Sequence, residues 1–117
     1  MTVSSPPAPR VQLTADLVQQ HQAMVWRFLR LLGAAPQAAD ELAQETFVRL
    51  WQHPPEDRGE AALAAWLRRT AQNLLINSRR RRGALPFDEH AVEAAWAAYA
   101  REDDGADYRQ ALQACPR

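Results

Sequence analysis

The feature that most constrains the fold is a basic segment at residues 66–82, WLRRTAQNLLINSRRRR. Apolar and small residues recur in and just before it at intervals of three and four, namely Leu63, Trp66, Leu67, Thr70, Ala71 and Leu74. This spacing is typical of one face of an α-helix. The segment also holds six of the fourteen basic residues of the chain and no acidic residue. We therefore expect a helix over residues 60–82 with one side in a core and a basic side exposed, although such a charge run can also be a merely solvated helix end.

Two further amphipathic helices are expected before this segment. Residues 15–32 follow Thr14, a good N-cap, and stop at Gly33, a natural C-cap residue. Pro36 suits the first position of a second helix. The apolar stripe of that helix consists of Ala39, Leu42, Ala43, Thr46, Phe47, Leu50 and Trp51. The fold class is thus all-α, a compact bundle of three main helices, because short connections favour antiparallel neighbours.

The pattern divides the chain into three parts. Residues 1–12 are proline-rich and predicted to be a disordered leader, and residues 13–83 form the helical domain. Residues 84–117 form an acidic, partly helical tail, with a fourth helix expected at about 88–100 around Val92, Trp96 and Tyr99.

Composition excludes several classes of protein. The net charge is zero, yet residues 66–83 carry six arginines and no acid, while seven acids lie on each side of them. Cys115 is the only cysteine, the three histidines are scattered, and no glycine-rich phosphate loop occurs. We therefore expect no disulfide, no metal, no cofactor and no enzymatic activity. No apolar run approaches the length of a membrane helix and no secretory signal is evident, so we expect a cytoplasmic protein without membrane insertion.

The outward faces of two helices are candidate binding surfaces. The second helix presents Asp40, Glu41, Gln44, Glu45, Val48 and Gln52. The pattern alone favours a solvated face, and Val48 within it is a mild sign that a partner covers the face. The third helix presents Arg69, Gln72, Asn73, Ile76, Arg79 and Arg80. Guanidinium and amide groups on one helix face suit phosphates and exposed bases, and so predict a nucleic-acid contact.

Residues 15–83 resemble region 2 of the extracytoplasmic-function (ECF) sigma factors, a branch of the sigma-70 family. The resemblance lies in Glu41-Leu42-Ala43-Gln44-Glu45-Thr46-Phe47, then Trp66-Leu67, then Thr70-Ala71-Gln72-Asn73, Asn77 and the arginines at 79–82. It implies a domain that docks on the clamp coiled coil of the largest subunit of RNA polymerase core. It also implies capture of the non-template strand of the −10 promoter element, and an anti-sigma factor as a partner.

The family roles can be carried over to matching positions. The resemblance assigns polymerase binding to Asp40, Glu41, Gln44, Glu45 and Val48. It assigns DNA binding to Arg58, Arg69, Gln72, Asn73, Ile76, Asn77, Arg79 and Arg80, with Asn73 as the expected base reader. A flipped base would enter a pocket near Asp57, Arg58 and Gly59. Asp57 departs from the aromatic residue common before the Arg-Gly pair, and residues 84–117 are expected to be the linker and the start of a missing region 4.

Two other interpretations stay open. The chain could be a sigma-like protein-interaction module that binds polymerase or an anti-sigma factor without reading DNA. It could also be a non-specific nucleic-acid binder that uses only the arginine run. The last interpretation does not require Asn73, whereas a sigma factor does.

The nucleic-acid interpretations predict a salt-dependent affinity. If six arginines neutralise phosphates of a single strand, the logarithm of the association constant should fall against the logarithm of salt concentration with a slope of up to about −4. Titration of a labelled oligonucleotide at several salt concentrations measures this slope. An affinity that does not change with salt would exclude both nucleic-acid interpretations.

Overall fold

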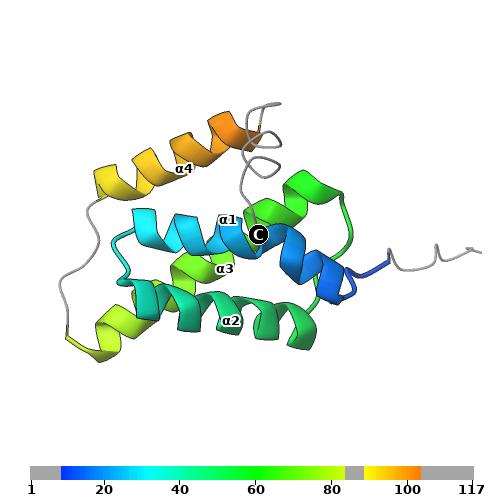
Figure 1. The fold of residues 1–117 in the computed structure, drawn as a ribbon, viewed down its shortest axis with the longest axis horizontal. Coiled ribbons are helices and arrows are strands. Elements are labelled where there is room, and N and C mark those ends of the chain that lie inside the picture. Colours follow the sequence, from blue (N-terminus) through cyan, green and yellow to red (C-terminus); the bar gives the residue numbers. More distant parts are fainter. Residues whose placement is uncertain (1–8, 84–88, 104–117) are drawn as a thin grey trace, which may run out of the picture.

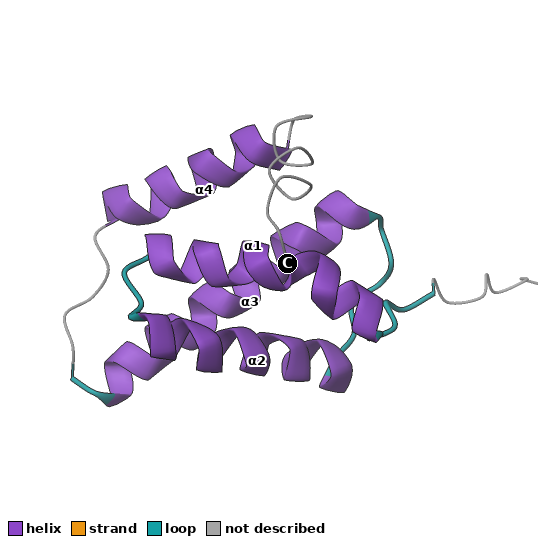
Figure 2. Ribbon diagram, in the orientation of Figure 1, coloured by secondary structure: helices purple, strands orange, loops and turns teal. Residues whose placement is uncertain are grey.

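Four α-helices make up most of residues 9–83 and 89–103, the residues that the computed structural model describes (Figures 1 and 2). They are α1 (Ala15–Leu31), α2 (Pro36–Gln52), α3 (Glu60–Arg81) and α4 (Glu89–Asp103). Helices α1, α2 and α3 pack against one another, and α4 lies along α1. The predicted all-α fold class is confirmed.

Local signals in the sequence set the ends of these helices. The Thr14 Oγ1 accepts a hydrogen bond from the Leu17 N–H at 3.1 Å, which caps α1. Pro36 occupies the first turn of α2, where its missing N–H costs nothing. Gly33, Gly59 and Gly83 have φ of 97°, 98° and 68°, so each supplies a left-handed conformation at a helix boundary. The predicted bounds of the first and third helices differ from these by one residue at one end.

The core lies between the apolar faces of α1, α2 and α3. Its largest fully buried apolar side chains are Phe28, Met24, Leu29, Leu50, Leu67 and Val25. Small residues, including Ala39, Ala43, Ala64 and Ala71, are buried beside them. Thr46, also fully buried, donates its hydroxyl to the Leu42 carbonyl at 2.7 Å. A buried polar group is thereby satisfied within α2 itself.

Trp51 does not lie in this core, and the prediction that it belongs to the buried stripe of the second helix is wrong. Its side chain is 69% exposed, whereas Leu50 beside it is fully buried. Successive residues of a helix are rotated by about 100°. The buried stripe is wide enough to hold the successive residues Thr46 and Phe47, but it ends at Leu50, and the Trp51 ring lies at its edge in contact with water.

Residues 9–11, which belong to the predicted leader, pair with the loop before α3. Residues 9–11 run antiparallel to residues 55–57, in an isolated bridge between Arg10 and Glu56. The Val11 N–H donates to the Pro55 carbonyl at 2.9 Å, and the Asp57 N–H donates to the Pro9 carbonyl at 2.8 Å. Val11 is buried. The predicted leader therefore extends too far at its C-terminal end; residues 1–8 lie outside the described residues.

Helix α4 is the fourth helix expected from the sequence, and it begins at residue 89 and ends at 103 instead of about 88 and 100. Ala95 is buried, and Val92 and Trp96 are half-buried against the core. The predicted tail beyond residue 103, with its proposed start of region 4, lies outside the described residues.

Replacing Leu67 with alanine should lower the free energy of unfolding by about 2–5 kcal/mol, because the fully buried side chain would leave a cavity between three helices. Trp51→Ala is the matched control. It removes a larger side chain from the surface, and we expect a change within about 0.5 kcal/mol. Urea denaturation followed by circular dichroism measures both values. A larger loss for Trp51→Ala than for Leu67→Ala would contradict this packing.

Candidate nucleic-acid interface

One side of α3 carries a ridge of cationic and amide side chains. Arg69, Asn73, Asn77 and Arg80 are all exposed and follow one another along the helix. Arg80 lies eleven positions after Arg69, so the ridge is about 16 Å long at a rise of about 1.5 Å per residue. Guanidinium groups stand at its two ends and carboxamides between them. This arrangement can hold phosphates at the ends and offer hydrogen bonds to bases between them.

Three other predicted contact residues lie off this ridge. Gln72, Ile76 and Arg79 are half-buried on the side of α3 that turns toward its neighbours. The Gln72 Oε1 accepts a hydrogen bond from the Trp96 Nε1–H at 2.7 Å. A Cβ added to Gly33 would lie 3.0 Å from the Arg79 Nη2, which places that guanidinium at the C-terminal end of α1. Helix C-termini carry partial negative charge and favour a cation there.

Arg68 is buried, although it belongs to the basic segment. Only 5% of it is accessible to solvent. Its guanidinium carbon lies 5.1 Å from the centre of the Trp96 ring, and its Nη1 lies 3.9 Å from the Met24 Sδ. Among the six arginines of the segment, those exposed are Arg69, Arg80, Arg81 and Arg82. With four exposed cations, the limit of the expected salt slope becomes about −3.

The loop before α3 holds a shallow pocket of about 340 Å³. Its lining consists of Arg10, Pro55, Glu56, Arg58, Ala62, Leu63 and Trp66. Trp66, expected in the core, is half-buried and contributes an aromatic surface there. The pocket lies beside the Asp57-Arg58-Gly59 stretch to which the family resemblance assigns the flipped base.

Two polar contacts hold this loop in shape. Arg58 donates from Nη2 and Nε to the Glu56 Oε2 at 2.9 and 3.2 Å, and this guanidinium holds the pKa of the Glu56 carboxyl below its usual value. The Asp57 Oδ1 accepts from the Gly59 N–H at 3.2 Å. Asp57 therefore supports the turn into α3, a role that an aromatic side chain at this position could not supply.

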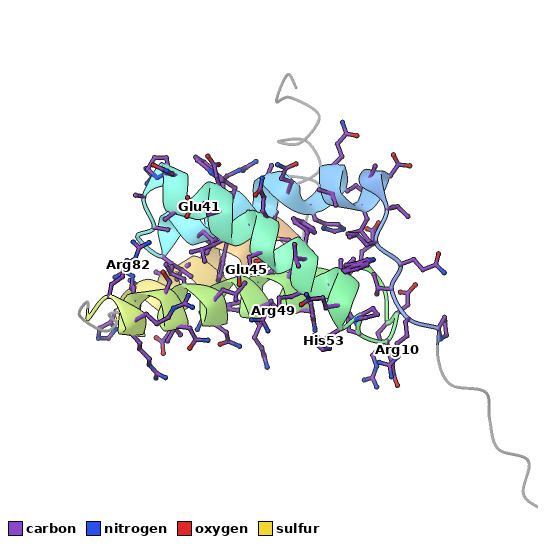
Figure 3. All side chains as sticks on the ribbon, turned by 90° about the horizontal axis from the view of Figure 1, so that it is seen from below. Arg10, Glu41, Glu45, Arg49, His53 and Arg82 are labelled. Carbon is purple, nitrogen blue, oxygen red and sulfur yellow. The ribbon has the colours of Figure 1, made fainter. Side chains whose placement is uncertain are left out.

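The predicted partner face of α2 is exposed as a whole. Its members are Asp40, Glu41, Gln44, Glu45 and Val48. Glu41 and Glu45 follow one another along α2, with Arg49 one turn further (Figure 3). Val48 is 47% exposed.

An apolar groove borders this face, and sequence reasoning missed it. The groove has a volume of about 500 Å³ and is lined by Leu13, Val18, Gln22, Ala43, Gln44, Phe47, Val48 and Trp51. Trp51 and Val48 expose apolar surface to water at this groove, and such exposed apolar surface marks interaction sites in proteins. The spacing of apolar residues in α2 predicted a buried Trp51. The exposure of the Trp51 ring, and with it the groove, could therefore not be predicted from that spacing.

Within residues 9–83 and 89–103, no three His, Cys, Asp or Glu side chains cluster in a way that could hold a metal ion. None of the four helices in this part of the chain is long and apolar enough to cross a membrane.

Comparison with known proteins identifies the family. The family model of sigma-70 region 2 matches residues 17–84. The chain is 44% identical over 81 residues to the ECF RNA polymerase sigma factor SigL of Mycobacterium tuberculosis strain H37Rv. It is 34% identical over 84 residues to the ECF RNA polymerase sigma factor SigE of Mycolicibacterium smegmatis. The resemblance seen in the sequence is confirmed, and the chain belongs to the sigma-70 family as region 2 of an ECF sigma factor.

Each match covers a larger share of this chain than of the relative. The SigL match covers 67% of this chain and 45% of SigL, and the SigE match covers 68% of this chain and 32% of SigE. The chain thus spans about half the length of SigL, or less in the case of SigE. No solved structure was found to match it.

Proposed function

We propose that this chain binds RNA polymerase core and recognises and melts the −10 promoter element for transcription initiation. The observation that carries the proposal is the exposed ridge of Arg69, Asn73, Asn77 and Arg80 on a helix of a sigma-70 region 2. The chain would have no catalytic role of its own. A cytoplasmic location follows from the proposal, because polymerase and promoter DNA are both there.

The ridge is suited to an unpaired strand. The arginines would neutralise phosphates and supply most of the affinity, since phosphate contacts dominate binding to nucleic acid. The carboxamides of Asn73 and Asn77 each offer a donor and an acceptor for the Watson–Crick edge of an exposed base. An unpaired base could also turn into the loop pocket beside Trp66 and Arg58, at the N-terminal end of the same helix.

The α2 face is suited to a protein partner with basic and apolar groups. Glu41 and Glu45 are exposed carboxylates, while Val48 adds an apolar contact between polar neighbours. A charged rim with a small apolar centre is the common composition of a protein interface. We assign this face to the clamp coiled coil of the largest polymerase subunit.

A second function rests on the apolar groove next to this face. The exposed ring of Trp51 and the groove volume of about 500 Å³ favour a protein partner over nucleic acid. In this alternative the chain is a protein-interaction module that binds polymerase or an anti-sigma factor without reading DNA. An anti-sigma factor is also compatible with the first function, as a competitor for the same surface.

Replacing Glu41 and Glu45 with arginine should abolish binding to polymerase core, because two attractive carboxylates become repulsive cations at the interface. The helical circular-dichroism spectrum should be retained, since both residues are exposed. Co-precipitation with purified core enzyme measures the binding. Asp16→Arg combined with Glu93→Arg makes the same change in charge at exposed sites on other helices, and should leave binding intact. Unchanged binding of the Glu41/Glu45 variant would refute the assignment.

Replacing Asn73 with alanine should weaken binding to a −10 strand by about 1–3 kcal/mol, through loss of hydrogen bonds to a base. Binding to scrambled strands of the same length should change less. Fluorescence anisotropy with labelled strands measures both affinities. Gln37→Ala removes an exposed amide at the start of α2 and serves as the control. Equal losses on the −10 and scrambled strands would show that Asn73 does not read a base.

A further inference from the structure

One side chain of α4, that of Trp96, contacts two other helices. The Trp96 ring packs edge-on against Phe28 of α1, with 5.0 Å between ring centres and 69° between ring planes. The Arg68 guanidinium of α3 lies over the same ring, and Gln72 of α3 accepts its N–H. Among the other described side chains of α4, Ala95 is buried and Val92 is half-buried against the core.

The hydrogen bond from Trp96 engages the side-chain amide of Gln72, which is one of the predicted DNA-binding residues. An indole N–H can only donate, so Gln72 must turn its amide oxygen toward α4. Residues three and four apart are neighbours on a helix surface, which makes Arg69 and Ile76 the flanks of Gln72. A strand held by Arg69 and Asn73 therefore runs beside the edge of α3 that α4 covers.

We propose that α4 is a removable cover that restrains strand binding, with Trp96 as its latch to Gln72 and Arg68. The inference rests on the proposed function, because it concerns regulation of the same strand-binding helix. In the docked state, α4 holds the Gln72 oxygen through the Trp96 N–H. Release of Trp96 frees the Gln72 amide for the strand, so DNA binding and α4 docking oppose each other.

The expected change in DNA affinity depends on the fraction of molecules in which α4 is released from the bundle. Apparent affinity is reduced by the fraction of molecules that are competent to bind. If α4 is docked in about nine of every ten molecules, Trp96→Ala should tighten binding about tenfold. A purely structural tryptophan would behave differently, since its loss would lower stability without raising affinity for DNA.

The test uses the full 117-residue chain and labelled single strands of about 12 nucleotides with −10-like and scrambled sequences. We expect Trp96→Ala to bind the −10-like strand about tenfold more tightly than the unmodified chain, with a retained helical spectrum. Ala97→Ser changes the neighbouring exposed residue of α4 and should leave the affinity unchanged. Equal or weaker binding by folded Trp96→Ala would overturn the latch while leaving strand binding by the chain intact. Binding by Trp96→Ala but not by the unmodified chain would support the latch. Binding by neither protein would overturn both the proposed function and the latch.

A second measurement does not depend on the stability of that variant. The indole N–H signal of Trp96 in the NMR spectrum can be assigned by its absence from Trp96→Phe. A saturating −10-like strand should shift this signal and speed its exchange with solvent, because the hydrogen bond to Gln72 is given up. A strand that binds without changing the position or exchange rate of this signal would overturn the proposal.

Discussion

Burial of one face of α3 against α1 and α2 is the constraint on which the rest of the structure depends. Leu67 and Ala71 are fully buried in it, and Leu63, Leu74 and Leu75 lie close to the same interface. Their packing fixes the rotation of α3 about its axis. A slip of one residue would turn the helix by about 100°, bury part of the arginine ridge and expose leucine. The hydrophobic core therefore determines which cations and amides can meet a DNA strand.

The same packing separates the basic segment into two parts with different roles. Arg69, Arg80, Arg81 and Arg82 form the outer part and are exposed to water, so their guanidinium groups would be available to phosphates. Arg68 instead lies against Met24 and Trp96, so its charge is stabilised by an aromatic face and by sulfur. Burying a cation is costly unless such contacts compensate. The position of Arg68 thus ties α4 to α3.

Much of this architecture could be predicted from residue spacing and helix caps. Thr14, Pro36 and the three boundary glycines act locally, so the helix ends lie close to where the sequence places them. Trp51, Gln72 and Arg68 could not be placed in this way. Their burial depends on which neighbour lies beside them, and periodicity shows only that a residue faces one side of its helix. Pairing of residues 9–11 with the loop at 55–57 escaped prediction for the same reason, because it joins segments far apart in sequence. The contact roles of individual side chains on α2 and α3 stay predictions.

Site-specific photocrosslinking in a complex with polymerase core and a forked −10 DNA tests the central claim most directly. A photoreactive amino acid at position 73 should crosslink to the non-template strand, and one at position 45 should crosslink to the largest polymerase subunit. Position 37, exposed at the start of α2, provides the background level. Crosslinks at positions 73 and 45 no stronger than at position 37, or DNA crosslinks from position 45 in place of position 73, would contradict the division of this domain into a polymerase-binding α2 and a strand-reading α3.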